Sequence, residues 1–354
     1  MSAQHRIRLL LVFGGRSSEH EISLRSTASV LAALDRDRFA PLLLGVRRDG
    51  RWCTGPAEAP LAEIIANGEP IDDLRSLGAE LVLPVLHGPY GEDGTFQGLL
   101  EVLGLPYVGS GVLASALCMD KAVVKRFLAA QEPAIPVVPW VEVHSSDLAD
   151  PGSAAATMKA IRERLGFPCF VKPANQGSSI GISKVDDADA LAAALELATR
   201  YDPKVIVERG LRCREIELAV YGDGGAATMV SAPGEIRVPS GAWYDYETKY
   251  ISDAATLHIP AQLPSQLREE LRDLALRAFR ATGCQGLARV DFFVDEVTGD
   301  PYLNEVNTMP GFTSISMYPK LMEHAGIPYT ALVTGLCELG LAAHRRRRAL
   351  RIQR

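Results

Sequence analysis

Apolar runs separated by a helix-like segment open the chain. The run at 7–13 (IRLLLVF) is almost entirely apolar, which is typical of a strand buried on both faces of a parallel sheet. A Gly-Gly turn follows, and the segment 17–34 then has the character of a helix, with Ser18 and Glu21 at the spacing of a capping box. Two further strands are predicted at 40–46 and 79–86. The pattern therefore predicts an open α/β unit with a parallel sheet.

A second and smaller unit follows. The segment 109–131 leads into a helix, and 167–185 has the pattern of a strand, a loop of small residues and a return strand. A helix at about 187–200 and a strand at 204–208 complete the pattern. We expect a hairpin-bearing α+β module here.

The last part of the chain is the largest. Its segment 238–261 is long and polar-aromatic, a type of loop that often acts as a lid. Around it, the pattern predicts an alternating strand at 215–223, an amphipathic helix at 267–283, strands at 286–296 and 301–306, and a last helix at about 328–343. We divide the chain into an N-terminal α/β domain at 1–118, a central module at 119–210 and a C-terminal domain at 211–354.

Charge and composition narrow the classes of function. The 354-residue chain has a net charge of −6, which argues against nucleic acid as its main partner. The basic tail at 344–354 is predicted to be a solvated, frayed end. We expect no membrane span, because no apolar stretch approaches the required length. The six cysteines are widely spaced and include no C-x-x-C pair, which favours a reducing cytoplasm over a disulfide or zinc framework.

Oxygen-bearing side chains gather on the two predicted strands near the C-terminus. Glu305 and Asn307 are two residues apart, so they share one face of a strand. If the strand that carries Asp291 forms a hairpin with it, Asp291 faces the same pair. Three oxygen donors without His or Cys suit Mg²⁺. The alternative for Asp291 alone is a solvated strand end, and the Glu305–Asn307 pair shifts the balance toward a metal site.

Two lysines flank the small central module. Lys121 follows Asp120 near a predicted helix start, where a cation is disfavoured unless an anion lies there too. Lys172 ends an apolar strand just before a loop rich in Gly and Ser, whose backbone N–H groups can approach phosphate oxygens. Each lysine alone is more often a surface charge, but together they indicate a nucleotide. Glu208 and Glu215 are weaker candidates for contacts with an adenine and a ribose.

Other nucleotide-binding patterns fit poorly. The chain has no G-x-x-x-x-G-K-[ST], and the GSGVLA segment at 109–114 is only part of a dinucleotide fingerprint, which we assign to a turn. Glu19 lies at the start of the first helix, beside the crevice where ligands bind in parallel sheets. It could hold an ammonium group there, although a Glu that merely complements the helix dipole is the simpler interpretation.

Taken together, these blocks resemble the D-alanine–D-alanine ligases of the ATP-grasp superfamily. The matching stretches, in order, are GGRSSEHEISLRS, LHGPYGEDGTFQGLLEVLGLPYVGSGVLASALCMDK, VKPANQGSSIGISK, YDYETKY, GLARVDFF and LNEVNTMPGFTSISMYP. The resemblance runs from about residue 7 to residue 341. It implies a three-domain ATP-grasp enzyme that joins two D-alanines for peptidoglycan synthesis in the cytoplasm, and it suggests a homodimer.

The resemblance also implies roles for particular residues. Those expected to contact ATP are Lys121, Lys172, Glu208, Leu211, Glu215 and Lys249, and those expected to hold two Mg²⁺ or Mn²⁺ ions are Asp291, Glu305 and Asn307. Those expected around the two D-alanines are Glu19, His87, Ser178, Tyr250, Ser316 and Met317, with Arg289 and the backbone N–H of Gly311 forming an oxyanion site. Ser178 is expected to link Glu19 and Tyr250 by hydrogen bonds.

Three rival functions remain at this point. A related ligase could use D-lactate or D-serine as its second substrate, but Tyr250 is retained in YDYETKY, which favours the amine. A nucleotide-binding regulator without turnover would be expected to have lost Arg289 or a metal ligand. A dehydrogenase built on the first α/β unit is disfavoured by the incomplete glycine pattern.

Overall fold

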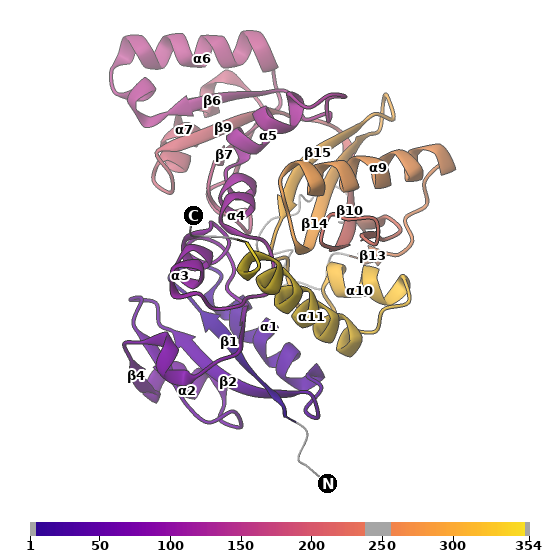
Figure 1. Cartoon of the computed structure of the whole chain (residues 1–354). Coiled ribbons are helices and arrows are strands. Elements are labelled where there is room, and N and C mark those ends of the chain that lie inside the picture. The colour runs from indigo at the N-terminus through magenta and orange to yellow at the C-terminus, as the bar shows by residue number, and fades with distance from the viewer. Residues whose placement is uncertain (1–4, 238–255, 351–354) are drawn as a thin grey trace.

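A computed structural model describes residues 5–237 and 256–350 and contains three sheets (Figure 1). The first sheet has the strand order β4-β3-β2-β1-β5, in which β1 runs parallel to both β2 and β5. Its strands are β1 (Ile7–Gly14), β2 (Phe39–Val46), β3 (Trp52–Thr54), β4 (Glu69–Ile71) and β5 (Leu81–Pro84). The helices of this unit are α1 (His20–Ala33), α2 (Leu61–Asn67), the short η1 (Leu74–Leu77) and α3 (Thr95–Leu103). The parallel strands β1, β2 and β5 confirm the predicted α/β unit, and β3 and β4 add an antiparallel edge.

The predicted capping box at the start of α1 is wrong. The helix begins at His20, and Glu19 is its N-cap without a side-chain cap hydrogen bond. Two competing contacts explain the difference. The backbone N–H of Glu19 donates to Ser17 Oγ, and the Glu21 carboxylate lies 3.2 Å from a guanidinium nitrogen of Arg48.

The segment 109–131 contains two helices, α4 (Val112–Met119) and α5 (Lys121–Ala129). The start of α5 confirms the helix start predicted near Lys121, whereas α4 was not predicted. Asp120 separates them with an extended backbone, and its carboxylate accepts hydrogen bonds from the N–H groups of Ala122 and Val123. This capping breaks the helix and starts a new one at Lys121.

The second sheet is antiparallel, with the order β6-β9-β7-β8. Its strands are β6 (Trp140–His144), β7 (Cys169–Pro173), β8 (Ser183–Val185) and β9 (Lys204–Arg209), accompanied by η2 (Ser145–Leu148), α6 (Pro151–Leu165) and α7 (Ala188–Thr199). Side chains of α6 and α7 share one core with the sheet. Strands β7, β8 and β9 and helix α7 agree with the predicted α+β module, whereas β6 and α6 were not predicted.

The third sheet has the order β13-β12-β10-β14-β15, with β11 paired to β10. Its strands are β10 (Cys213–Gly222), β11 (Met229–Val230), β12 (Gly234–Arg237), β13 (Thr256–His258), β14 (Gly286–Asp295) and β15 (Pro301–Asn307). The helices are α9 (Ser265–Ala281), α10 (Met317–His324) and α11 (Tyr329–Arg348). The sequence predicted an alternating strand at β10, yet 216–220 is buried throughout. Ile216 and Leu218 pack in the core beneath α9, while Ala219 packs on the side of α10 and α11, so both faces are covered.

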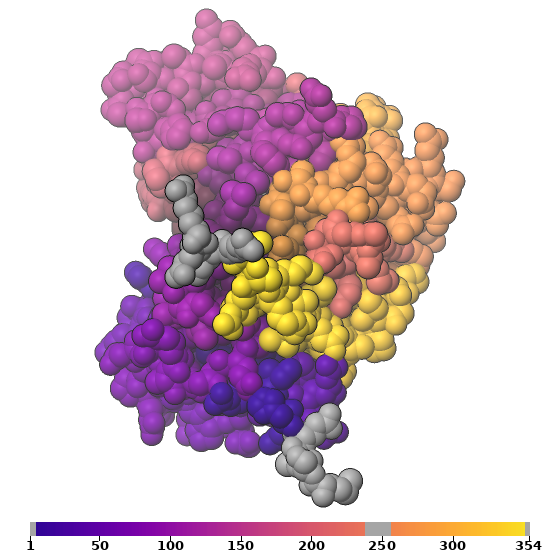
Figure 2. All heavy atoms as spheres, in the orientation of Figure 1, coloured from indigo at the N-terminus to yellow at the C-terminus, as the bar shows by residue number. Residues whose placement is uncertain are grey.

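The C-terminal helix joins the first and third sheets. Leu332 and Leu336 of α11 share one core with Leu83 of the first sheet and Leu287 of the third. Figure 2 shows the same arrangement, with the yellow C-terminal segment seated against the purple N-terminal unit. Within the described residues, no single helix is long and apolar enough to span a membrane; α10 and α11 reach that length and composition only together, across a bend of 99°.

The prediction of a frayed basic tail is wrong for its first residues. Helix α11 continues to Arg348, and Arg346 lies 3.1 Å from the Asp223 carboxylate. The Arg347 guanidinium lies 3.2 Å from Glu101 and stacks over the Tyr107 ring at 4.9 Å. These contacts hold the basic turn on the protein surface, and residues 351–354 lie outside the described part.

His87 connects the first sheet to the loop after β15. Its Nδ1 lies 3.0 Å from the Met309 carbonyl oxygen and its Nε2 lies 2.9 Å from Ser26 Oγ. Burial lowers the pKa of His87 to about 4, so the ring is neutral at pH 7. A neutral ring satisfies both contacts if Nδ1–H donates to the carbonyl and Nε2 accepts from the hydroxyl.

We predict that the free energy of unfolding falls as the pH is lowered from about 6.5 to 4. In this window the unfolded state binds a proton on His87 and the folded state does not, so acid favours unfolding. His87→Gln should remove up to about 3 kcal/mol of this pH dependence. Urea unfolding at a series of pH values measures it, with His324→Gln at an exposed position as the control. Equal pH dependence in the wild type and His87→Gln would contradict the assignment.

Candidate active site

A cavity of about 280 Å³ is lined by residues of both the second and the third sheets. The second sheet and its loop contribute Phe170, Lys172, Glu208 and the 176–179 segment, and the third contributes Cys213, Glu215, Phe293, Asn304 and Glu305. The wall is completed by Lys121, Ile182, Arg209 and Leu211. The five described residues predicted to contact a nucleotide (Lys121, Lys172, Glu208, Leu211 and Glu215) therefore all line one cavity, while Lys249 lies outside the described residues.

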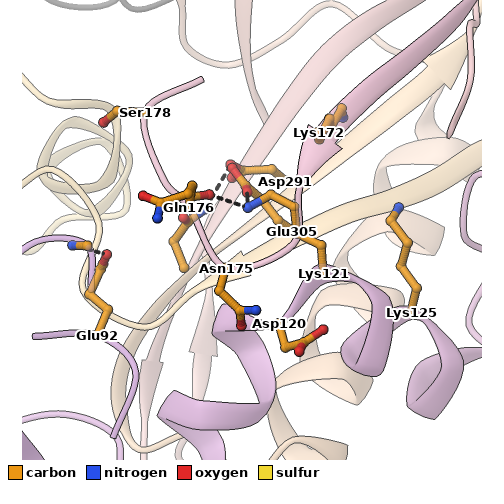
Figure 3. Close-up of polar contacts among 12 residues, drawn as sticks. Glu92, Asp120, Lys121, Lys125, Lys172, Asn175, Gln176, Ser178, Asp291 and Glu305 are labelled. Carbon is orange, nitrogen blue, oxygen red and sulfur yellow. Dashed lines mark hydrogen bonds and ion pairs between the residues drawn. The ribbon is translucent and has the colours of Figure 1, made fainter. Parts of the chain in front are cut away.

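The first turn of α5 brings Lys121 to the cavity. Its Nζ donates to the carbonyl oxygen of Gln176 at 2.6 Å and lies 3.8 Å from Glu305 Oε2 (Figure 3). Its backbone N–H donates to the carbonyl oxygen of Ala174. Lys121 thus connects the loop after β7 to the metal-binding candidates on β15.

Lys172 shares the carboxylate of Glu208 with a third residue, Lys125. Lys172 Nζ lies 2.5 Å from Glu208 Oε2, and Lys125 Nζ lies 2.7 Å from Glu208 Oε1. Burial alone would raise the pKa of Glu208, but the charges of Lys125 and Lys172 outweigh it and lower the pKa to about 2. For Lys172, the attraction of Glu208 likewise outweighs burial and raises the pKa. The Glu208 carboxylate is therefore directed to two lysines, a partnership that the sequence did not indicate.

The hairpin of β14 and β15 brings the predicted oxygen donors together. The strand register pairs Asp291 with Glu305, with an irregularity directly after Asp291. The Asn307 amide donates to Asp291 Oδ2 at 3.0 Å. Two carboxylates and an amide supply oxygen ligands of the kind that bind a hard cation, and such a cation keeps water or substrate oxygens as its further ligands. The set therefore fits Mg²⁺ or Mn²⁺. Among the described residues no three or more His, Cys, Asp or Glu side chains are grouped for metal binding, so the substrate would have to complete the coordination.

Arg289 lies on the same strand as Asp291 and is held by two carboxylates. It donates to both Asp291 oxygens at 2.8 and 2.7 Å, and its Nε lies 2.9 Å from Glu217 Oε2. Burial would lower the pKa of Arg289, but Asp291 and Glu217 outweigh it and raise the pKa. The guanidinium is therefore a fixed positive charge beside the candidate metal ligands. Glu217 was not predicted, although its position in the strand places it opposite Asp291.

Glu19 is buried at the N-cap of α1, and its carboxylate contacts a distant loop, which a role in complementing the helix dipole alone would not require. Ser178 Oγ donates a hydrogen bond to Glu19 Oε1 across 159 residues of sequence. Two glycines pack directly against the carboxylate: a Cβ atom at Gly177 would lie 2.7 Å from Oε2, and one at Gly88 would collide with the same oxygen. Ser178 itself has a left-handed backbone with φ of 51°. The structure thus brings Glu19 and Ser178 together as predicted, and their predicted third partner, Tyr250, lies outside the described residues.

Glu92 is a further acidic residue at this end of the site that the sequence analysis missed. Its Oε2 accepts a hydrogen bond from the Gly88 N–H at 2.7 Å (Figure 3). Burial of the carboxyl group, and then the charge of Glu19, raise the pKa of Glu92 well above its ordinary value. It fixes the loop that packs on Glu19, and its place in the GPYGEDG segment was the available signal.

The loop before α10 carries the remaining predicted residues. Ser316 is the N-cap of α10, and its Oγ lies 2.7 Å from Thr313 Oγ1. Gly311 lies close by, since a Cβ atom there would be 3.4 Å from Ser316 Oγ. The Met317 side chain is buried in the core and packs on Gly234, so only its backbone is available for binding.

Comparison with known proteins identifies the family. The family model for the D-ala D-ala ligase N-terminus matches residues 8–110, and that for the D-ala D-ala ligase C-terminus matches residues 129–338. A D-alanine–D-alanine ligase of Solibacter usitatus is 46% identical over 349 residues, which covers 99% of this chain and 100% of the relative. One of Deinococcus radiodurans is 48% identical over 344 residues, which covers 94% and 98%.

Solved structures agree with the sequence relatives. The D-alanine-D-alanine ligase of Coxiella burnetii superposes with a TM-score of 0.83 at 33% identity, covering 97% of each chain. The VanG D-Ala:D-Ser ligase of Enterococcus faecalis superposes with a TM-score of 0.82 at 34% identity, covering 95% of this chain and 100% of that one. This chain has the ATP-grasp fold and belongs to the D-alanine–D-alanine ligase family.

Proposed function

We propose that this protein joins two D-alanines into D-alanyl-D-alanine at the expense of ATP, in the service of peptidoglycan synthesis. The observation that carries the proposal is the near-complete coverage of relatives named D-alanine–D-alanine ligase at 46–48% identity. The cavity lined by Lys121, Lys172 and Glu305 supports it, because cations and carboxylates converge there as a nucleotide and a metal require.

ATP would lie in this cavity. Lys121 and Lys172 would contact its phosphates, with Lys249 from the segment outside the described residues. Leu211 and Glu215 would line the adenosine site, and Glu208 would act mainly through the lysines that hold its carboxylate. Asp291, Glu305 and Asn307 would hold two Mg²⁺ or Mn²⁺ ions, which neutralise phosphate charge when bound.

The first D-alanine would lie beside Glu19. Its ammonium group matches the buried carboxylate that Ser178 already engages, and His87 stays neutral nearby at pH 7. The second D-alanine would be bound through its carboxylate by Ser316 and the backbone of Met317. Tyr250 belongs to the same proposed set.

The chemistry has two steps. A carboxylate oxygen of the first D-alanine attacks the γ-phosphorus, the bond to the β-phosphate oxygen breaks, and an acylphosphate and ADP result. The amine of the second D-alanine then attacks the acyl carbon. Arg289 and the backbone N–H of Gly311 would stabilise the oxyanion, after which the C–O bond to phosphate breaks and the proton lost by the amine leaves with the phosphate. Water would hydrolyse the acylphosphate, so we assign the role of a lid to residues 238–255, which lie outside the described residues. The predicted loop extended to 261, but Thr256–His258 form strand β13 of the third sheet.

Further expectations from the family stay proposals. They are the domain division at 1–118, 119–210 and 211–354, a homodimer, and a cytoplasmic location without nucleic acid or membrane partners. The three separate sheets support the division, although α11 shares its core with the first sheet. Since the VanG D-Ala:D-Ser ligase superposes as well as the Coxiella enzyme does, the fold alone does not select the second substrate.

We predict that the purified protein releases phosphate from ATP and Mg²⁺ when D-alanine is the only amino acid. Mass spectrometry should identify D-alanyl-D-alanine in the same mixture. Parallel reactions with D-alanine plus D-serine, and with D-alanine plus D-lactate, test the related ligases. A mixed product that exceeds D-alanyl-D-alanine at equal concentrations would refute the proposed second substrate.

We predict that Arg289→Lys lowers kcat by about 10²-fold, the effect of removing an oxyanion donor. The lysine keeps a positive charge between Glu217 and Asp291 but cannot reproduce the fork of the guanidinium. The affinity for ATP should stay within about threefold of the wild type, because Arg289 does not line the nucleotide cavity. Arg268→Lys in α9 is an exposed control. Unchanged kcat would exclude Arg289 from the chemical step.

A further inference from the structure

Lys125 is completely buried, and the proposed reaction gives it no role. Its side chain has 0% exposure, compared with 9% for Lys172 and 3% for Glu208. It leaves α5 one turn after Lys121, and both lysines extend toward the strands of the cavity (Figure 3). Its Nζ lies 2.7 Å from Glu208 Oε1 and 3.4 Å from the carbonyl oxygen of Leu303. A buried ammonium is costly and persists only where its contacts repay the loss of water.

The charges of the three residues do not cancel. With Lys125 and Lys172 protonated and Glu208 ionised, the group carries a net charge of +1. Without Lys125, the Glu208 carboxylate and the Lys172 ammonium would form a neutral pair. A lysine that is neutralised by its own carboxylate attracts a phosphate only weakly, because the two charges act on the ligand with opposite signs.

The position of each residue determines which charge faces the ligand. Lys172 and Glu208 line the cavity, and Lys125 does not. Lys125 therefore does not contact a nucleotide in the cavity directly, and it can act on one only through Lys172 and Glu208. By binding Oε1 of Glu208, it leaves Oε2 for Lys172 and holds the carboxylate in one orientation.

We propose that Lys125 is a positioning residue for the nucleotide triphosphate, because it offsets the charge of Glu208 from behind and so leaves more of the positive charge of the Lys172 ammonium available to the phosphates. The inference rests on the proposed function in one respect only, which is that the cavity is the ATP site. The lowered pKa of Glu208 is consistent with it, since a carboxylate shared by two ammonium groups stays ionised. Burial lowers the pKa of Lys125 itself, and the negative charge of Glu208 opposes that shift.

The test compares the affinities for ATP and for adenosine, because only ATP carries the phosphates. In Lys125→Met, the ratio of ATP affinity to adenosine affinity should fall about tenfold, which corresponds to ~1.4 kcal/mol. Calorimetric titration with the non-hydrolysable analogue of ATP and with adenosine measures both. The KM for D-alanine should change by less than about threefold. Lys159→Met removes the same charge from the same module at a position that is 65% exposed, and it should leave the ratio unchanged.

A double variant separates charge from packing. Lys125→Met with Glu208→Gln returns the net charge to +1, so the ratio of ATP to adenosine affinity should recover toward the wild-type value. If the double variant has the same ratio as Lys125→Met or a lower one, the charge explanation is wrong. A ratio that is unchanged in Lys125→Met, or an equal loss for ATP and adenosine, would also overturn the proposal, since both indicate a purely structural role.

Two provisions keep the test decisive. Should Lys125→Met fail to fold, Lys125→Gln retains a donor for the Leu303 carbonyl and removes the same charge, and its ratio is expected to fall likewise. Both ligands are titrated without D-alanine, so the result does not depend on which dipeptide the protein makes. Two results together would refute the proposed function and leave this inference intact. They are that the protein makes no D-alanyl-D-alanine, and that Lys125→Met still lowers the ratio of ATP affinity to adenosine affinity.

Discussion

The balance of buried charge where the second and third sheets meet constrains the rest of the structure. Lys125, Glu208 and Lys172 form one group, and Glu217, Arg289 and Asp291 form another. Removing one partner from such a group leaves an uncompensated buried charge, which typically costs about 3–5 kcal/mol. Neither group is complete on a single element, because α5, β7 and β9 supply the first, while β10 and β14 supply the second. Two lysines of α5 also connect the second unit to the third sheet, because Lys125 Nζ lies 3.4 Å from the carbonyl oxygen of Leu303 on β15 and Lys121 Nζ lies 3.8 Å from Glu305.

The same arrangement produces the site. The ladder between β14 and β15 fixes Asp291 opposite Glu305, and Asp120 starts α5 where Lys121 can bridge Glu305 and the loop after β7. At the far end, Gly88 and Gly177 allow two loops to close on the Glu19 carboxylate. The proposed phosphate-binding end and the proposed ammonium-binding end are thus set on one continuous framework, as the transfer of a phosphoryl group to a small amino acid requires.

Local features of the sequence predicted much of this fold. Strand periodicity located the parallel strands, and the spacing of Glu305 and Asn307 with a preceding strand correctly predicted that Asp291 would join them. The helix start predicted at Asp120 and Lys121 is that of α5, whereas the Asp150–Pro151 signal for the start of α6 was present in the sequence and did not lead to a prediction. The capping box failed because Glu21 had a better partner in Arg48, which no local rule reveals. The side chains of β10 alternate between two faces as predicted, but the second face is not exposed, because Glu217 pairs with Arg289 and Ala219 packs on the side of α10 and α11.

Partner choice over long sequence separations could not be predicted from the residues alone. No feature of the sequence near Ser178 indicates that its partner is Glu19. Lys125 likewise has the spacing of an ordinary helix lysine, and only the structure shows that Glu208 lies beside it. The roles of Ser316, Met317 and Tyr250 came from the family resemblance, and they stay proposals.

The central claim is that a D-alanine carboxylate is activated by phosphorylation at the site that the buried charges form. The most direct measurement uses D-alanine with ¹⁸O in both carboxylate oxygens and follows the released phosphate by mass spectrometry. The account predicts one ¹⁸O atom in each phosphate, because a carboxylate oxygen attacks the γ-phosphorus and leaves with it. Phosphate without ¹⁸O, released at the rate of ATP turnover, would show that no acylphosphate forms and would contradict the account.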